Sequence, residues 1–463
     1  MSYSVASYPQ AIAELNRMAP ELHTQPGAPR RKFSLEEIRI LLEALGDPHK
    51  KFRSVLIAGT NGKGSTASTL ASILQNTGLR IGLYTSPHLE RPNERIKISS
   101  AGAAGAENTL QDISDDVFGR LYFQVHDAAQ QLVLSGKLAQ LPSFFETLTA
   151  MAFLHFAEEA VEIAVLEVGI GGRLDATNIV DPLISVITDI SLDHTEWLGP
   201  TITDITREKA GILRSNGTLV TLPQHPEANQ ALGEVAVSLN VHGVSATPYM
   251  PTINAGDSYS VEVLDEEIEV ASPLHGPHQH RNIALAIAAA VELATHHGLP
   301  VTPASVAAGI RNTRWPGRLE CITTHAKGSA AVQWIVDVAH NPAGAWALRA
   351  SLSSLSKTQE SPRLLIFSCL KDKPLAELAQ ILFPLFDQIV FAPIASPRAT
   401  PMQELLAAAE QTGTPARAAE TVAEALNLAQ KLVQEYAPPQ VVVSGSVYLV
   451  GEARKLLLQQ GAQ

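Results

Sequence analysis

The sequence predicts an α/β protein of two domains, each built on a doubly wound parallel sheet. Three observations predict this class. Short apolar runs typical of buried parallel strands alternate with helical segments along most of the chain. A glycine-rich turn joins the first such strand to a helix, and the alternation restarts after a Pro-Gly turn at 316–317. At 463 residues, the chain is also too long for one ordinary core.

We expect the first domain to span residues 1–314, with a small β-rich subregion at about 218–274, and the second to span 315–463. Strands of the first domain are predicted at 55–58, 80–84, 161–168 and 183–188, and helices after the glycine-rich turn, at 113–134, from 143, within 201–213 and at 282–296. The second domain is predicted to have strands at 333–338, 363–369, 388–391 and 440–444, separated by helices at 343–355, 376–382, 401–410 and 418–435.

The glycine-rich turn is the strongest functional signal. Backbone N–H groups in such a turn, together with the N-terminus of the following helix, bind phosphate. Lys63 is placed to reach the terminal phosphates, and the hydroxyl of Ser65 or Thr66 to bind Mg²⁺. The match to G-x-x-x-x-G-K-[ST] is imperfect because Ile57 replaces the first glycine and Gly64 follows the lysine. A glycine-rich turn with a solvated lysine is the alternative.

Polar residues follow two further strands of the first domain. The strand at 161–168 leads into a glycine-rich loop at 169–178, and the strand at 183–188 leads to Asp193 and His194. In a doubly wound sheet these strand ends lie beside the phosphate turn. His194 fits a metal ligand or a hydrogen-bonded loop histidine. Glu146 fits a helix capping box, which needs no catalysis, and Lys209 fits a solvated helix face.

The segment at 85–96 is predicted to be a loop, because Pro87 and Pro92 oppose regular structure. Loops that follow sheet strands commonly bind ligands. A solvated polar loop is the alternative for His88, Glu94 and Arg95.

Composition excludes several classes of protein. The net charge of −12 argues against nucleic acid or an anionic membrane as a general partner. Cys321 and Cys369 form neither a disulfide framework nor a zinc motif, which fits a reducing compartment. The first eighteen residues lack the pattern of a secretory signal, and the apolar stretch at 283–294 is too short for a membrane span. We therefore expect a cytoplasmic location.

Ten segments, in this order, closely resemble the folylpolyglutamate synthase/dihydrofolate synthase family, relatives of the Mur ligases. They cover nearly the whole chain: GTNGKGS at 59–65, YTSPHLERPNERI at 84–96, FFETLTA at 144–150, LEVGIGGRLDATN at 166–178, LDHTEWLG at 192–199, REKAGI at 207–212, HQHRNIA at 278–284, WPGRLE at 315–320, DVAHNP at 337–342 and SGSVYLVGEAR at 444–454. The resemblance implies a P-loop Mur-ligase-like domain followed by a smaller Rossmann-like domain.

The resemblance also implies an ATP-dependent ligase that joins L-glutamate to a pterin-linked carboxylate through an acyl phosphate. It implies ATP and two Mg²⁺ ions as cofactors, dihydropteroate, folates and glutamate as substrates, and a monomer. The residues that it assigns to ATP are Gly59, Thr60, Asn61, Gly62, Lys63, Gly64, Ser65, Thr66, Asn282, Arg318, Asp337 and His340. Those that it assigns to the acceptor substrate are Thr85, Ser86, Pro87, His88, Arg95, Arg173 and Asp175.

The metal ligands implied by the resemblance are Ser65, Glu146, His194 and, if it is carbamylated, Lys209. Lys63, His194, Lys209 and Arg318 are the residues implied in catalysis. The SPHL and GGRLDATN segments favour the bifunctional bacterial type, which makes dihydrofolate and then extends folates. The alternatives are a folylpolyglutamate synthase alone, a Mur-type ligase for a cell-wall precursor, and a nucleotide-switch protein without ligase chemistry.

Overall fold

The computed structural model describes residues 7–18, 34–99, 109–252, 258–325, 331–355, 364–435 and 440–461. Their contacts divide the chain into two compact units. Unit 1 comprises Met1–Ser86, Pro92–Ala271 and Arg281–Thr313, and unit 2 comprises Pro87–Arg91, Ser272–His280 and Arg314–Gln463. Two short segments of the predicted first domain, Pro87–Arg91 and Ser272–His280, therefore belong to unit 2.

Unit 1 is built on an eight-stranded sheet of order β4-β3-β2-β5-β1-β6-β7-β8. The strands are β1 (Arg53–Ala58), β2 (Ile81–Tyr84), β3 (Ile96–Ser99), β4 (Leu110–Asp112), β5 (Ile163–Glu167), β6 (Ile184–Ile187), β7 (Thr218–Thr221) and β8 (His242–Ser245). β3 and β4 pair antiparallel at one edge, whereas the other six strands are parallel to one another. The predicted doubly wound sheet is confirmed.

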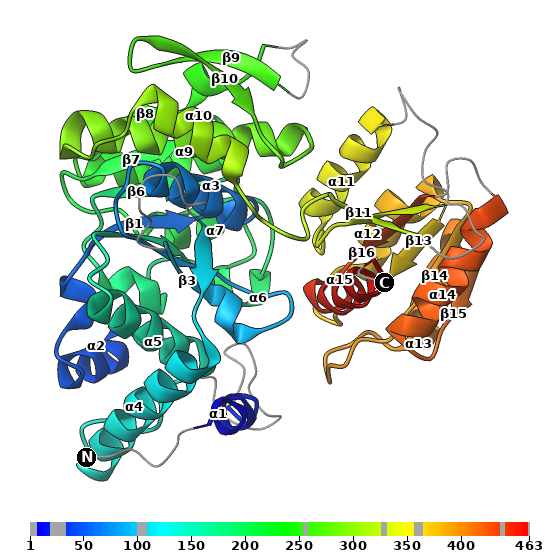
Figure 1. Cartoon of the computed structure of the whole chain (residues 1–463), viewed down its shortest axis with the longest axis horizontal. Helices are drawn as coiled ribbons and strands as arrows, with labels where there is room; N and C mark the ends of the chain where they lie inside the picture. Colours follow the sequence, from blue (N-terminus) through cyan, green and yellow to red (C-terminus); the bar gives the residue numbers. More distant parts are fainter. Residues whose placement is uncertain are drawn as a thin grey trace. The chain divides into compact units, whose positions relative to one another are not determined.

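Helices cover both faces of this sheet (Figure 1). The helices of unit 1 are α1 (Tyr8–Leu15), α2 (Leu35–Ala44), α3 (Lys63–Gln75), α4 (Asp115–Leu134), α5 (Phe144–Glu158), α6 (Thr195–Leu198), α7 (Ile202–Ala210), α8 (Pro226–Ser238), α9 (Pro277–His297) and α10 (Pro303–Asn312). Leu56 packs in one core with α2, α4, α5 and α7, while its neighbours Val55 and Ile57 pack in a second core with α3, α9 and α10. Burial on both faces explains why β1 reads as a continuous apolar run.

The segment at 218–274, expected to be a β-rich subregion, is divided in the structure. β7, α8 and β8 continue the parallel sheet. Among the described residues of this segment, β9 (Ser258–Val263) and β10 (Glu266–Ala271) form a separate antiparallel hairpin. The helix was missed because α8 buries only three of its residues and shows little apolar periodicity.

Unit 2 contains a six-stranded sheet of order β11-β12-β16-β13-β14-β15, in which only β11 is antiparallel to its neighbour. Its strands are β11 (Glu320–Thr324), β12 (Val332–Val336), β13 (Leu364–Phe367), β14 (Gln388–Phe391), β15 (Ala416–Ala418) and β16 (Gln440–Ser444). Its helices are α11 (Pro342–Leu355), α12 (Leu375–Leu382), α13 (Met402–Thr412), α14 (Val422–Leu432) and α15 (Val447–Gly461). Within the described parts of both units, no helix has the length and apolar character needed to cross a membrane.

Candidate functional site

The turn between β1 and α3 has a backbone path that requires glycine at two points. Gly59 and Gly62 have φ angles of +152° and +89°. A Cβ at Gly59 would lie 1.8 Å from Thr188 Oγ1, and one at Gly62 would lie 2.1 Å from Asn282 Oδ1. Both glycines therefore serve a left-handed backbone and a close approach.

The end of β6 holds this turn in place. The backbone N–H groups of Thr60 and Asn61 donate to the carbonyl oxygen of Asp189 at 2.8 and 3.2 Å. The Asp189 carboxylate in turn accepts from Arg281, with Nε 2.8 Å from Oδ2 and Nη2 2.6 Å from Oδ1. Arg281 lies in α9, directly before Asn282, so α9 and β6 together fix the turn from outside.

Two lysines meet at the carbonyl oxygen of Gly59. Lys63 Nζ donates to it at 3.1 Å and to the Thr60 carbonyl at 3.2 Å, while Lys209 Nζ donates to it at 2.7 Å. Lys209 is 4% exposed. Burial, followed by the charge of Lys63, lowers the pKa of Lys209 from 10.5 to about 7, although Asp193 opposes the shift. The solvated helix face that periodicity alone suggests for Lys209 is therefore wrong, because its side chain is buried and donates to the Gly59 carbonyl oxygen.

A buried carboxylate that the sequence analysis did not assign to the site lies next to the turn. Glu167 is the last residue of β5 and pairs in register with Ile57 of β1, two positions before Gly59. It is 4% exposed and accepts a hydrogen bond from the Ser86 backbone N–H at 3.0 Å. Its position at the end of a buried strand, before a glycine-rich loop, was the signal that could have identified it.

The predicted metal ligands fall in different surroundings. Ser65 lies in the first turn of α3 and is 1% exposed. Glu146 forms the predicted capping box with Ser143, whose backbone N–H donates to Glu146 Oε2 at 2.7 Å. His194 has a φ of +51°, and its Nε2 lies 3.9 Å from Asp193 Oδ2. The described residues contain no group of three or more His, Cys, Asp or Glu side chains able to hold a metal ion.

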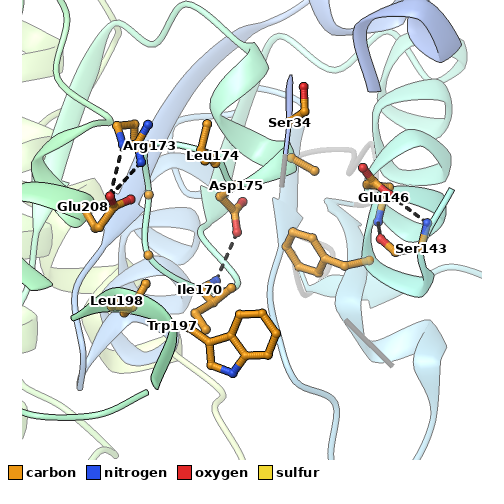
Figure 2. A pocket seen from close by; sticks show the side chains of 14 residues that line it. Ser34, Ser143, Glu146, Ile170, Arg173, Leu174, Asp175, Trp197, Leu198 and Glu208 are labelled. Atoms are coloured by element: carbon orange, nitrogen blue, oxygen red, sulfur yellow. Dashed lines mark hydrogen bonds and ion pairs between the residues drawn. The ribbon is translucent and has the colours of Figure 1, made fainter. Parts of the chain in front are cut away.

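A pocket in unit 1 brings together two of the predicted substrate residues (Figure 2). Its lining comprises Ser34, Ser143, Phe145, Glu146, Ile170, Gly171, Gly172, Arg173, Leu174, Asp175, Ala176, Trp197, Leu198 and Glu208. Figure 2 shows Asp175 between the Arg173–Glu208 ion pair and Glu146. Arg173 Nη2 lies 2.8 Å from Glu208 Oε1. The walls thus combine two aromatic rings with charged groups.

Asp175 organises the loop that lines this pocket. Its carboxylate accepts from the backbone N–H groups of Gly169, Ile170 and Thr177 at 2.9, 3.1 and 3.0 Å, and from Thr177 Oγ1 at 2.5 Å. Burial raises the pKa of Asp175, although these hydrogen bonds oppose the shift. The carboxylate therefore fixes the backbone amides of the loop as well as lining the pocket.

The loop after β2 divides between the units. Thr85 is 1% exposed and donates its backbone N–H to the Arg95 carbonyl at 3.0 Å. The Arg95 guanidinium lies 5.1 Å from the centre of the Phe144 ring. Pro87 and His88 belong to unit 2, and the second proline starts a 3-10 turn, η2 (Pro92–Arg95). The segment 85–96 is therefore not wholly irregular.

Three predicted nucleotide residues lie in unit 2. Asp337 accepts from the backbone N–H groups of Leu319 and Ala339 at 3.0 and 2.9 Å. His340 Nδ1 lies 2.8 Å from the Val338 carbonyl oxygen. Arg318 stands between Gly317 and Leu319, which both have positive φ angles, +72° and +48°. Asp337 thus orients the backbone next to Arg318.

Known protein families match two successive parts of the chain. Residues 125–290 match the Mur ligase middle domain, and 317–447 match the Mur ligase glutamate ligase domain. A Mycobacterium tuberculosis dihydrofolate synthase/folylpolyglutamate synthase is 33% identical, covering 98% of this chain and 94% of its own. A crystal structure of M. tuberculosis folylpolyglutamate synthase complexed with ADP and AMPPCP matches with a TM-score of 0.83 at 32% identity, covering 98% of both chains. Escherichia coli FolC in complex with DHPP and ADP matches with a TM-score of 0.80 at 28% identity, again over 98% of both chains.

Proposed function

Because the chain belongs to the dihydrofolate synthase/folylpolyglutamate synthase family of Mur ligases, we propose that it adds L-glutamate both to dihydropteroate and to reduced folates. It is an ATP-dependent ligase. The observation that carries the proposal is the pairing, in unit 1, of a glycine-rich phosphate turn bearing Lys63 with an aromatic, charged pocket lined by Arg173 and Asp175.

The chemistry that we assign to the site proceeds in two steps. A carboxylate is a poor electrophile, so an oxygen of the acceptor carboxylate first attacks the γ-phosphorus of ATP, which gives an acyl phosphate and ADP. The glutamate amine then attacks the acyl carbon, and inorganic phosphate leaves as the amide forms. Phosphoryl transfer depends mainly on positioning and on positive charge. The backbone N–H groups of residues 62–65, at the start of α3, and the ammonium of Lys63 supply both. We assign Asn282, Arg318, Asp337 and His340 to the nucleotide as further contacts.

The donor set suits Mg²⁺. This ion keeps several waters and is usually bound by one or two carboxylates together with substrate phosphates. A site without three protein ligands is therefore expected for it. We propose that Ser65 and Glu167, at the edge of the sheet beside the turn, hold one ion, and that His194 and Lys209 hold a second; Glu146 remains the alternative carboxylate. When bound, Mg²⁺ neutralises charge on the transferring phosphoryl group.

The surroundings of Lys209 favour its carbamylation. A lysine amine attacks CO₂ only when it is neutral, and the pKa of about 7 makes roughly half of the side chains neutral at neutral pH. The product is an anion, which replaces the repulsion between Lys209 and Lys63 by attraction. Its oxygens are also ligands of the kind that Mg²⁺ prefers, whereas an ammonium is not.

We propose that the unit 1 pocket receives the pterin ring. Phe145 and Trp197 offer flat apolar faces, and the loop around Asp175 offers polar groups at the rim. Thr85, Ser86, Pro87, His88 and Arg95 remain assigned to the rest of the acceptor. We further propose a monomer that works in the cytoplasm without a nucleic-acid or membrane partner, in keeping with the net charge of −12.

One assay tests these assignments. Purified protein receives ATP, Mg²⁺, glutamate and either dihydropteroate or a reduced folate, and phosphate release is followed for each acceptor. We expect release with both. Release with the folate alone would leave a folylpolyglutamate synthase, and release with neither would overturn the substrate assignment. Nucleotide binding without any acceptor-dependent release would favour a switch protein.

Lys63→Ala tests the phosphate turn within the same assay. Loss of the ammonium removes charge stabilisation worth several kcal/mol, so we expect turnover to fall by at least about a thousandfold. The far-ultraviolet circular dichroism should stay unchanged. The matched control is Lys51→Ala, an exposed lysine of unit 1, which should retain full activity. Activity of Lys63→Ala close to that of the wild type would contradict the role given to this lysine.

A further inference from the structure

Three of the sequence motifs contain residues that no proposed step uses, and these residues meet within unit 2. They are Leu89 and Glu90 in the loop after β2, Glu320 at the start of β11, and Gly451 and Arg454 in α15. We call residues 87–91 the loop tip and residues 315–320 the Arg318 turn. The loop tip joins unit 2 although the residues on both sides of it, Ser86 and Pro92, belong to unit 1.

The loop tip is held first by close packing. A Cβ at Gly451 would lie 2.0 Å from the carbonyl oxygen of Leu89, so α15 has glycine where the loop backbone crosses it. The Leu89 side chain packs against the core that contains Val338 and Leu449. Its Cδ1 would lie 3.3 Å from a Cβ at Gly317, in the Arg318 turn. Leu89 therefore contacts both α15 and the Arg318 turn.

The second restraint is a set of ion pairs centred on Arg454. Its Nη1 lies 3.0 Å from Glu90 Oε1, and its Nε lies 2.9 and 3.1 Å from Glu320 Oε2 and Oε1. The three side chains are only 19%, 23% and 24% exposed for Arg454, Glu90 and Glu320. Ion pairs that are this poorly exposed to solvent and joined by direct hydrogen bonds contribute more to stability than fully exposed surface pairs do.

Glu320 carries the restraint into the Arg318 turn. Its Oε2 also accepts the backbone N–H of Gly317 at 2.9 Å. On the other side of Arg318, the Leu319 N–H donates to Asp337 Oδ2 at 3.0 Å. The backbone at Gly317 and Leu319 has positive φ angles, which an L-residue such as Leu319 adopts only when its surroundings impose them. The Arg454 guanidinium therefore restrains the loop tip through Glu90 and the Arg318 turn through Glu320.

We propose that Arg454 is a positioning residue that fixes the loop tip and the Arg318 turn as one body. Through Glu90 it holds the tip of the loop to which the acceptor residues Thr85 to His88 are assigned, and through Glu320 it holds the backbone next to Arg318, which is assigned to the nucleotide. This proposal rests on the proposed function for the identity of the two ligands. The restraint itself is a property of the unliganded chain and can be measured without any substrate.

Four variants separate the restraint through Glu90 from the restraint through Glu320. Glu90→Gln should raise KM for the acceptor about tenfold, the loss expected for a charge-assisted hydrogen bond, and leave the Kd for ADP unchanged. Glu320→Gln should raise the Kd for ADP, measured by calorimetry, by a similar factor of about ten. Arg454→Met should do both, while kcat falls less than KM rises. Arg454→Lys should restore either the acceptor KM or the Kd for ADP, but not both, because an ammonium cannot bond both carboxylates as the planar guanidinium does.

Hydrogen exchange gives a readout that does not depend on activity. Arg454→Met should speed exchange of the amides at 88–91 and at 317–319 in the unliganded protein, and Glu90→Gln should speed only the first set. Arg417→Met is the matched control, since Arg417 is an exposed arginine of unit 2 in β15. If the amides of Arg454→Met exchange as in the wild type, the proposal is overturned even when the ligase reaction is confirmed. If exchange changes as expected while no pterin acid is turned over, the substrate assignment fails and the restraint stands.

Discussion

Removing the buried ammonium of Lys209 should stabilise the unliganded protein in a way that depends on pH. The folded-state pKa of about 7 lies below the 10.5 of an ordinary lysine because burial and Lys63 disfavour the charge. Between these two values the unfolded chain binds more protons than the folded one, so the stability contributed by Lys209 rises as the pH rises. The full difference corresponds to about 5 kcal/mol, which is present above pH 10.5 and lost below pH 7.

The substitution Lys209→Met keeps an unbranched side chain of similar length and removes the charge. At low pH the variant should therefore be the more stable protein. Its advantage over the wild type should narrow by about 2.5 kcal/mol between pH 7.5 and pH 9.5, as the wild-type amine loses its proton. Titrating groups that do not interact with Lys209 contribute equally to both proteins and cancel in the difference.

Equilibrium urea unfolding of both proteins at several pH values measures this difference. The buffers should be free of CO₂ and contain EDTA. The exposed Lys51→Met serves as the control and should show no such pH-dependent difference. A difference between Lys209→Met and the wild type that stays constant within about 0.5 kcal/mol over this range would refute a depressed pKa. Bicarbonate at pH 7.5 should stabilise the wild type and leave the variant unchanged.

Gly62→Ala should weaken ADP binding at least tenfold by calorimetry, because its Cβ would lie 2.1 Å from a side-chain oxygen; Gly78→Ala, also at positive φ but with open space around it, should not. Arg281→Met, which frees the carboxylate that it clamps, should raise KM for ATP about tenfold and leave the acceptor KM within twofold. Glu167→Gln should raise the Mg²⁺ concentration needed for half-maximal activity. Glu146→Ala should instead lower the stability by about 1 kcal/mol, because it removes the side-chain oxygen that accepts the Ser143 N–H in the capping box, and an equal Mg²⁺ shift in both variants would contradict this assignment.

The elements that were predicted from sequence are those whose signal is local. β5 is buried along its whole length, so its apolar run identified it directly. The phosphate turn was found because its glycines are required by its own backbone. By contrast, β4 and β15 have three residues each and are mostly exposed, and β11 alternates in burial at the edge of its sheet. Short edge strands carry no continuous apolar run, which explains why the sequence did not reveal them.

The parts of the site that were missed depend on which segments become neighbours. The end of a buried strand before a glycine-rich loop marks Glu167 as a candidate, but its closeness to the phosphate turn depends on β5 lying next to β1 in the sheet order. The sequence allowed Glu146 to be either part of a capping box or a metal ligand, and the structure shows the capping box. Lys209 looked solvated by periodicity, yet α7 packs so closely on the glycine loop that a Cβ at Gly172 would lie 2.8 Å from the Lys209 carbonyl oxygen. Its side chain is therefore directed inward.

Lys63 and Lys209 donate to the same acceptor, the Gly59 carbonyl oxygen, and this arrangement affects both the stability of the site and its affinity for anions. Two cations that converge on one carbonyl oxygen repel each other, and the repulsion is strong because Lys209 is withdrawn from solvent. The folded protein relieves it by releasing a proton from Lys209. A bound triphosphate would relieve it by charge neutralisation, and a carbamate by reversing the sign of one partner. A cation pair that lowers the stability of the unliganded fold is thus the arrangement that favours an anionic ligand, so variants that remove it should gain stability and lose turnover together.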